Sequence, residues 1–317
     1  MSDVLDRLSL STCWSSSRHT DGYAMIQEIV DLGFKCVELS HGIRISLVPG
    51  ILKAINEGLV EISSVHNFCP LPPGVLHAAP NVFKPSAANS REQALWERHT
   101  KQTLDFSVKV GAKRVVMHSG SANFLFRSPH KRLEQWIEES DLKAAELSEN
   151  DVFVNFRDHA MKRIQRASKA AMHRIKERFK QAVEWADERS VQLCIENREG
   201  LAEMPLDQEM RDFIDELSAP KQIGYWHDTG HAQIKHQYGL LDHREHLSAL
   251  SERLVGFHLH DTTDSGADHQ LIGSGTVDFK MIAEFIRPEH TLVLELSPQL
   301  SAEEVVQSRS YIGALLQ

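Results

Sequence analysis

The sequence predicts a (β/α)8 barrel, an α/β fold of eight parallel strands, with an elaborated helical insertion between the fourth and fifth strands. Short apolar runs alternate with longer stretches of helical periodicity along nearly the whole chain. Eight such strand–helix units follow one another with mostly short connections, which is the pattern of a parallel barrel. Six consecutive runs also end in a carboxylate or an imidazole, and barrels gather such side chains at one end of their strands.

In the first half of the chain, the predicted strands are short apolar runs and the predicted helices end near glycines. The strands occupy residues 8–12, 36–39, 59–65 and 114–117. Apolar side chains recur at helical spacing between them, which predicts helices over residues 21–32, 47–56 and 91–110. Gly33, Gly58 and Gly111 follow these helices closely, and glycine is a common C-terminal stop signal.

A long polar segment, residues 128–189, separates the fourth strand from the fifth. It mixes basic and acidic side chains and predicts two or more helices, the last over about residues 161–187. A connection of this length is unusual in a barrel. The segment covers the mouth of the barrel, forms an oligomer contact or is a surface elaboration. The sequence leaves these alternatives open, and with them a homo-oligomeric state.

The second half of the chain repeats the alternation. Strands are predicted over residues 191–195, 222–226, 255–259 and 291–296. Helices are predicted over residues 206–217, 231–254, 279–286 and 302–316. A doubly wound open sheet rarely needs eight regular units, and no glycine-rich nucleotide fingerprint follows the first strand. No linker interrupts the rhythm, so residues 1–317 are expected to form a single barrel domain.

The composition is that of a water-soluble globular protein. Hydrophobic residues make up 41% of the 317 residues, enough for a full core, and the net charge of −9 disfavours nucleic acid and anionic membranes as partners. No apolar run reaches the roughly 18 residues of a membrane span, and the N-terminus does not resemble a signal peptide. The four cysteines lie far apart without a CxxC pair and are expected to be reduced. A cytoplasmic location is therefore expected.

The ends of the last six predicted strands supply side chains that bind metals. In chain order they are His66, His118, Glu196 with Asn197, His227 with Asp228 and His231, His258 with His260 and Asp261, and Glu295. In a barrel all of these ends meet at one mouth. Buried carboxylates at this density would repel one another and stay protonated, and a divalent cation reverses that cost. The pattern therefore predicts a divalent-metal site.

The mixture of carboxylate and imidazole suits Mn²⁺, Co²⁺, Zn²⁺, Fe²⁺ or Mg²⁺, and the absence of cysteine disfavours a structural zinc site. His258 and His260 are two residues apart, so they share one face of the strand, and only one need bind the metal. His227 precedes Asp228 and is expected to face away from it, in a packing or hydrogen-bonding role. Three histidines on a predicted helix are expected to be solvated or to cap it, namely His236, His243 and His246.

Five short motifs follow one another in the second half of the chain. They are IEN at residues 195–197, DTGH at 228–231, HLHD at 258–261, DHQLIGSGTVDF at 268–279 and LELSP at 294–298. In this order and spacing the sequence resembles the xylose isomerase-like TIM barrel superfamily, which contains sugar isomerases and epimerases and also the endonuclease IV enzymes. The resemblance runs over nearly the whole chain.

The sugar-acting members of this superfamily hold one metal with a Glu, an Asp, a His and a Glu. The resemblance implies that the corresponding ligands here are Glu196, Asp228, His258 and Glu295. His258 is preferred to His260 because the ligand histidine in the family is followed after three residues by an acid or an amide, which Asp261 supplies.

The resemblance also implies a reaction, which is proton transfer next to a carbonyl. The metal polarises the substrate, and Glu196 and Glu295 stand on opposite faces as catalytic base and acid. His231 would orient a substrate hydroxyl, with Arg198 or His66 as further substrate contacts.

Endonuclease IV implies a different reaction, the zinc-dependent cleavage of a phosphodiester at an abasic site. Its nine ligands for three zinc ions match eight positions here: His66, His118, Glu196, Asp228, His231, His258, His269 and Glu295. The ninth ligand, an Asp, is replaced by Ala267, with Asp268 one place later. A second metal, bound through His66, His118, His231 or His269, therefore stays open. The negative net charge fits poorly with gripping a DNA backbone.

The ketose 3-epimerase branch carries an Arg six residues after the ligand His, where this chain has Asp264, so its substrate is not inherited. The leading prediction is an isomerase or epimerase of a carbohydrate, or of a sugar-like polyol or keto acid, that uses Mn, Co, Zn or Mg. The alternative is an endonuclease IV-like zinc phosphodiesterase. A non-catalytic barrel is disfavoured by the intact ligand set. No phosphate-binding glycine loop stands out, so the sequence gives no sign of a phosphorylated substrate.

Overall fold

The computed structural model describes residues 4–124, 128–140, 142–217 and 221–317. Eight parallel strands close into a barrel in the order of the chain, and β8 pairs with β1 to complete the ring. The strands are β1 Leu8–Ser11, β2 Cys36–Leu39, β3 Glu61–His66, β4 Arg114–Met117, β5 Gln192–Glu196, β6 Ile223–Asp228, β7 Leu254–Leu259 and β8 Thr291–Leu294. The (β/α)8 barrel predicted from the sequence is confirmed.

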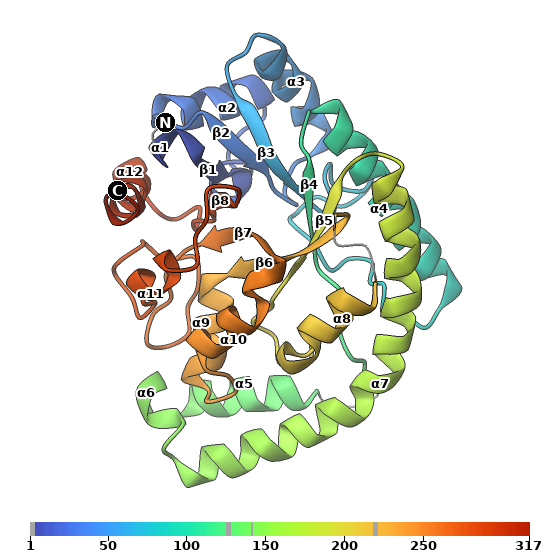
Figure 1. Cartoon of the computed structure of the whole chain (residues 1–317), viewed down its shortest axis with the longest axis vertical. Helices are drawn as coiled ribbons and strands as arrows, with labels where there is room; N and C mark the ends of the chain where they lie inside the picture. Colours follow the sequence, from blue (N-terminus) through green and yellow to red (C-terminus); the bar gives the residue numbers. More distant parts are fainter. Residues whose placement is uncertain (1–3, 125–127, 141, 218–220) are drawn as a thin grey trace.

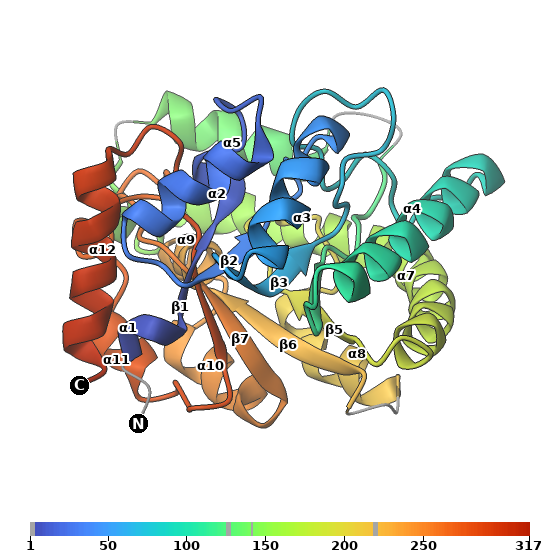
Figure 2. The same cartoon turned by 90° about the horizontal axis from the view of Figure 1, so that it is seen from above.

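Helices surround the barrel on its outer side (Figures 1 and 2). Outside the insertion they are α1 Val4–Arg7, α2 Gly22–Asp31, α3 Val48–Asn56, α4 Ser90–Lys109, α8 Met210–Glu216, α9 Thr229–Gln237, α10 His243–Leu250, α11 Phe279–Ala283 and α12 Ala302–Leu315. Short 3-10 turns lie at Thr12–Trp14, Ile45–Leu47, Asp207–Glu209 and Ser251–Arg253. The two ends of the chain meet where α1 packs against α12. Within the described ranges, no helix combines the length and hydropathy needed to cross a membrane.

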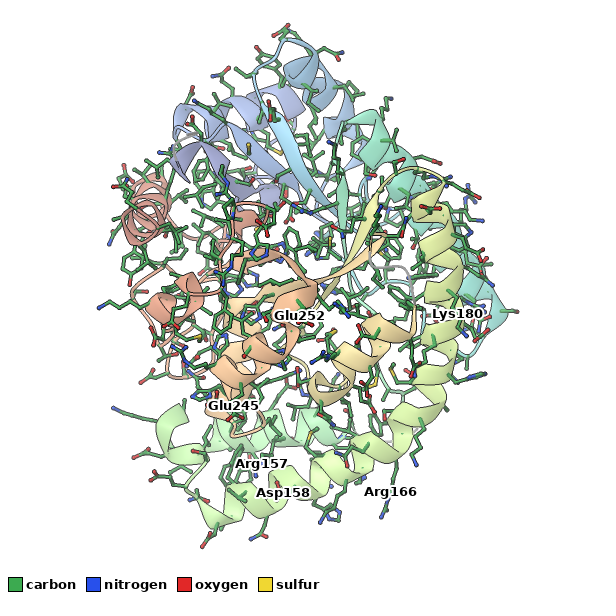
Figure 3. The ribbon with its side chains drawn as sticks, in the orientation of Figure 1. Arg157, Asp158, Arg166, Lys180, Glu245 and Glu252 are labelled. Atoms are coloured by element: carbon green, nitrogen blue, oxygen red, sulfur yellow. The ribbon has the colours of Figure 1, made fainter. Side chains whose placement is uncertain are left out.

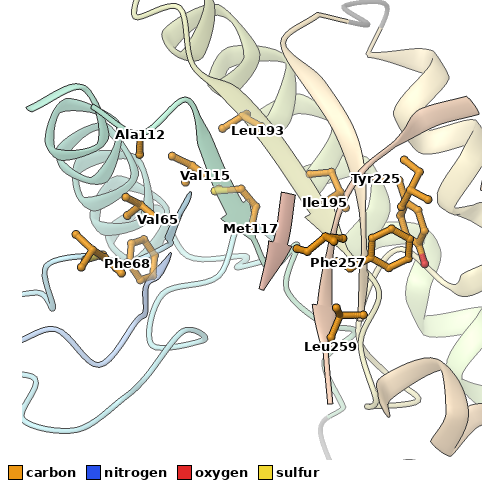
Figure 4. Packing of buried hydrophobic residues seen from close by; sticks show 14 of the residues in the cluster. Val65, Phe68, Ala112, Val115, Met117, Leu193, Ile195, Tyr225, Phe257 and Leu259 are labelled. Carbon is orange, nitrogen blue, oxygen red and sulfur yellow. The ribbon is translucent and has the colours of Figure 1, made fainter. Parts of the chain in front are cut away.

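Strand alternation sorts side chains between the outer core and the barrel interior. Val115, Leu193 and Tyr225 belong to the main core, which packs the barrel against the helices (Figure 4). The alternate residues form a separate buried cluster of Val116, Cys194, Trp226 and Val293. Two positions after each of these stand His118, Glu196, Asp228 and Glu295. Because side chains on a strand repeat with a period of two, these polar residues extend the interior face just beyond its apolar layer.

The insertion between β4 and β5 contains α5 Pro129–Glu139, α6 Ala144–Leu147 and the long helix α7 Asp151–Asp187. In Figure 1, α7 runs down one side and along the lower edge of the molecule, with α5 packed beside it. The expected start of this helix near residue 161 is wrong, because Asn150 caps α7 by accepting a hydrogen bond from the backbone N–H of Phe153. Exposed charged residues such as Arg166 and Lys180 (Figure 3) dominate the composition of α7, so its few buried apolar residues are hard to recognise in the sequence.

Other boundaries also differ from the sequence prediction. The single helix expected over residues 231–254 is two helices, α9 and α10, separated by a turn in which Gly239 adopts a left-handed φ of 62°. The helix expected over residues 206–217 is reduced to a 3-10 turn followed by α8. Strands β3, β5 and β6 extend farther than their apolar runs and include His66, Glu196 and Asp228.

Candidate functional site

Four of the residues singled out in the sequence meet at the carboxyl end of the barrel. Potential ligand atoms of Glu196, Asp228, His258 and Glu295 all lie within 4.8 Å of one another, and the four side chains are buried. Nδ1 of His258 lies 2.7 Å from Glu196 Oε1, 2.9 Å from Glu295 Oε2 and 3.9 Å from Asp228 Oδ2. A ring nitrogen carries at most one hydrogen and cannot satisfy three carboxylates, whereas a divalent cation can. The donor set therefore fits a metal ion.

Burial and neighbouring charges shift the pKa values of this group in opposite directions. Burial raises the pKa of Glu196, but Arg198 and hydrogen bonds from neighbouring histidines outweigh it and hold the pKa well below its usual value. Burial also raises the pKa of Glu295, and the charge of His258 reverses that shift. For His258 burial lowers the pKa, and Glu295 and Glu38 raise it well above its usual value. Glu196 and Glu295 are thus ionised, and the cations that balance them here are Arg198 and the His258 ring.

Glu38 on β2 is a residue of the site that the sequence analysis missed. Its carboxylate oxygens lie 3.0 and 3.1 Å from Nε2 of His258 and accept hydrogen bonds from the hydroxyls of Ser11 and Ser64. The side chain is fully buried. Glu38 therefore fixes the His258 ring with Nδ1 turned toward the other three carboxylates. The available signal was an acid within the apolar run CVEL at residues 36–39, where alternation places it on the interior face.

A second group shares Glu196 with the first. It consists of His66, His118 and Glu196, all buried. Nε2 of His118 lies 2.8 Å from Glu196 Oε2, and Nε2 of His66 lies 3.7 Å from the same oxygen. Burial lowers the pKa of His118 to about 4, so its ring is neutral and able to donate a lone pair. Glu196 therefore faces the first group with Oε1 and the second with Oε2.

A third group consists of His231, His260 and His269. Both ring nitrogens of His260 already have partners: the backbone N–H of His269 donates to Nδ1 at 2.9 Å, and Nε2 lies 2.9 Å from Asp228 Oδ1. Because Nδ1 is an acceptor, Nε2 carries the hydrogen and donates it to Asp228. His258 and His260 thus share a strand face but differ in role, since His260 holds Asp228 in place. His269 has a left-handed φ of 54°, which is uncommon outside glycine, and its ring stacks on His260.

Arg198, expected as a substrate contact, is occupied by carboxylates of the protein. Its Nη1 donates to Glu196 at 3.0 Å, Nη2 lies 2.8 Å from Glu199, and Nε lies 3.4 Å from Glu203. It also lies 3.2 Å from Nδ1 of His231. In this arrangement Arg198 positions Glu196 and keeps it ionised. Glu199 and Glu203, which follow it in the same loop, were not singled out by the sequence analysis.

The expectation that His243 and His246 are solvated or cap a helix is wrong, whereas His236 is exposed. His243 and His246 are buried between β6 and α10. There His227 and Tyr225 point out of the barrel toward them. Nε2 of His227 lies 3.0 Å from Nε2 of His243, and the Tyr225 hydroxyl lies 2.8 Å from His227 and 3.0 Å from His246. His227 faces away from Asp228, as the sequence predicts. The sequence prediction for His243 and His246 was wrong because it inferred exposure to solvent from the polarity of their side chains.

The same network reaches the metal-ligand candidates through Asn197. The Tyr225 hydroxyl donates to Asn197 Oδ1 at 3.0 Å, and that oxygen also accepts the backbone N–H of Asp228 at 2.8 Å. The backbone carbonyl of Asn197 lies 3.0 Å from Nδ1 of His231. Tyr225 thus anchors the turn that presents Asp228 and His231.

Tyr225→Phe is expected to lower the free energy of unfolding by about 1–3 kcal/mol, because it leaves buried polar groups on His227, His246 and Asn197 without their shared partner. Denaturant unfolding followed by circular dichroism measures the change. Tyr311→Phe is the matched control, since Tyr311 is 40% exposed, and it should cost far less. Equal costs for the two variants would show that the Tyr225 network adds no stability.

Two cavities adjoin the site. One, of about 580 Å³, is bordered by Glu295 and His269 and extends to Ser40, His41 and Arg44. The other, of about 620 Å³, lies between Glu199 and Glu203 on one side and α5 on the other, lined there by His130, Lys131 and Glu134. The insertion therefore contributes one wall of this second cavity.

Comparisons with known proteins agree with this architecture. A family model described as xylose isomerase-like TIM barrel matches residues 26–308. The chain is similar to a D-tagatose 3-epimerase-like protein, with 15% identity, a TM-score of 0.66 and coverage of 98% of this chain and 97% of that one. It is also similar to a 3-keto-D-glucoside 4-epimerase from E. coli, with 13% identity, a TM-score of 0.67 and coverage of 97% and 99%.

A third similar structure is an L-ribulose 3-epimerase, with 14% identity, a TM-score of 0.68 and coverage of 98% of this chain and 94% of that one. A search of curated proteins finds no match to the sequence. At such low identities the structural likeness establishes the fold, and each substrate named above belongs to the protein that bears the name.

Proposed function

The chain belongs to the xylose isomerase-like TIM barrel family, and from this premise we propose that it is a divalent-metal-dependent isomerase or epimerase of a carbohydrate, or of a sugar-like polyol or keto acid. The observation that carries the proposal is the convergence of Glu196, Asp228 and Glu295 on one nitrogen of His258, next to a cavity of about 580 Å³. Sugar epimerases among the similar structures support this class of substrate.

One divalent ion would be held by Glu196, Asp228, His258 and Glu295. The mixed carboxylate and imidazole donors suit Mn²⁺, Co²⁺, Zn²⁺ or Mg²⁺. When bound, such an ion polarises a substrate carbonyl as a Lewis acid. Glu38 and His260 support the ligands from behind, since they hold the ring of His258 and the carboxylate of Asp228.

Glu196 and Glu295 are the groups that would move the proton. Their neighbours hold both pKa values well below the usual value, so each carboxylate is able to accept a proton. Glu295 borders the cavity and reaches a bound substrate directly. Glu196 approaches Nδ1 of His258 from another strand, and Arg198 keeps it in place. One carboxylate would remove the proton beside the carbonyl, and the other, after taking up a proton from solvent, would return one from the opposite face.

Metal content per chain tests this proposal. After chelation and reconstitution, elemental analysis is expected to find about one equivalent of Mn²⁺ or Co²⁺ per chain, as four-ligand mononuclear sites bind one ion. Asp228→Asn should lose most of this ion, whereas Asp264→Asn, at an exposed position, should retain it. Activity on a panel of ketoses and polyols should depend on the same ion. Two or three zinc ions per chain, together with cleavage of an abasic duplex, would overturn the proposal.

That outcome would support the alternative, an endonuclease IV-like zinc phosphodiesterase. In its favour, Glu196 faces His258 with one oxygen and His118 with the other, so it is able to bridge two ions. Against it, Ala267 supplies no ligand where that family has an Asp, and the net charge is −9.

A further inference from the structure

We propose that the substrate carries an anionic group, a carboxylate or a phosphate, and that Arg44 binds this group in the cavity bordered by Glu295. The inference rests on the proposed function, because it takes this cavity as the substrate site. It concerns the class of carbohydrate, which the similar structures leave undetermined.

Arg44 follows β2, in the loop that leads into α3, and lines the cavity. Its Nη2 donates to the backbone carbonyls of Ser16, at 3.1 Å, and of His19. A guanidinium has five N–H donors in a planar fork, so the remaining donors are available to a ligand. Those two carbonyls hold the side chain in a fixed place at the wall of the cavity.

Among the described residues, the charge of Arg44 has no carboxylate partner. Over the ranges that the structure describes, no carboxylate forms an ion pair with it, although acids outnumber lysines and arginines by 44 to 35 in the chain. Two other described arginines are paired: Arg18 lies 2.8 Å from Glu28, and Arg198 contacts three glutamates. Among the described residues that line this cavity, Arg44 is the only lysine or arginine. A fixed, unpaired guanidinium in a concave site is well suited to bind a carboxylate or a phosphate.

His41 supplies a second group without a partner in the same wall. Its Nδ1 is buried and has no hydrogen-bond partner among the described residues. A buried polar atom left unpaired is costly, and a ligand hydroxyl in this cavity would satisfy it. Hydroxyls of Ser16, Ser17 and Ser297 also line the cavity. The wall thus combines one arginine and several uncharged hydrogen-bonding groups with two carboxylates, those of Asp268 and Glu295.

These features together describe one class of ligand. Hydroxyls and an imidazole bind the polyol part, while Arg44 binds an anionic end, and Glu295 faces the reacting carbons. The cavity of about 580 Å³ falls within the usual range of small-molecule sites. A sugar acid or a sugar phosphate matches this wall better than an uncharged sugar.

Isothermal titration of the metal-loaded protein with three ligands of one ketose skeleton tests the inference. The probes are D-fructose, D-fructuronate and D-fructose 6-phosphate. At least one charged member is expected to bind about tenfold or more tightly than D-fructose, since a charge-assisted bidentate contact is worth at least that factor. Comparing the two charged members then distinguishes a carboxylate from a phosphate.

Arg44→Gln should reduce the binding of the charged ligand to the level of D-fructose and leave D-fructose itself unchanged. Arg18→Gln is the matched control, because it removes the same charge from a side chain that is already paired with Glu28, and it should preserve the preference. Equal affinity of the wild type for all three ligands would overturn the inference.

If Arg44→Gln weakened the binding of D-fructose and of the charged ligands equally, the inference would also be overturned. Arg44 would then act only by holding the backbone at Ser16 and His19. A protein that binds one ion per chain but none of the three probes would contradict the anionic-sugar assignment and leave the metal centre standing. A protein that binds no ion would instead contradict the proposed function. The two failures are therefore distinguishable.

Discussion

Glu295→Gln is expected to lower kcat by about 10³-fold on a confirmed substrate, in the range typical for loss of a general acid or base. The amide is nearly isosteric with the carboxylate and keeps an oxygen toward Nδ1 of His258, but it accepts no proton. Much of the metal binding should survive, because Glu196, Asp228 and His258 are untouched. Steady-state kinetics at saturating metal, with elemental analysis of the same sample, measures both quantities.

The matched control is Glu289→Gln, at an exposed position shortly before β8. This change removes the same charge far from the cavity and should leave kcat unaltered. If Glu295→Gln kept near-normal turnover with its metal bound, the assignment of proton transfer to the two glutamates would be wrong. Loss of metal in step with activity would reassign Glu295 to a ligand role alone.

Glu38→Gln is expected to weaken metal affinity by about 10–100-fold, the usual cost of losing the outer partner of a ligating histidine. The carboxylate now lies 3.0 Å from Nε2 of His258, where it fixes the ring and makes the ligand more basic. The neutral amide of Gln would hold the His258 ring less firmly and would make it a less basic ligand. Titration of the metal-free protein with Mn²⁺ measures the dissociation constant.

A role confined to positioning predicts a second result. At saturating Mn²⁺, the turnover of Glu38→Gln should recover to near the wild-type value, because Glu38 touches no substrate. Glu61→Gln serves as control, as Glu61 is exposed at the start of β3. An unchanged dissociation constant in Glu38→Gln would show that the contact with His258 is incidental to metal binding.

Strand positions were predictable because each strand contains an apolar run that belongs to the core. Residues 36–39 and 114–117 match β2 and β4 without adjustment. Strands β3, β5 and β6 run past the predicted ends because backbone pairing continues through His66, Glu196 and Asp228, where the side chains turn polar. A hydrophobic pattern stops where the buried polar site begins, although the strand does not. The errors at the ends of β3, β5 and β6 therefore fall at the site itself, whereas β8 ends at Leu294, two residues before its predicted end.

Errors among the helices have another cause. The start of α7 was misplaced because exposed charges dominate its composition, while Phe153 and Ile164 form a sparse buried stripe. His243 and His246 were expected to be solvated or to cap a helix because they are polar and lie on a helix, yet Tyr225 and His227 give them partners inside the protein. Only the packing of α10 on β6 reveals those partners.

The sequence by itself determined the barrel and the set of residues gathered at its carboxyl end. Both follow from short-range rules, since strands repeat with a period of two and parallel strands of a barrel end on the same side. Only the tertiary structure decided which side chains of the site contact one another. It paired Glu38 with His258 across 220 positions of the chain, set His260 against Asp228 and bound Arg198 to Glu196. Among the described residues it placed no carboxylate in an ion pair with Arg44. These choices depend on how distant strands and loops pack together, and no local pattern encodes them.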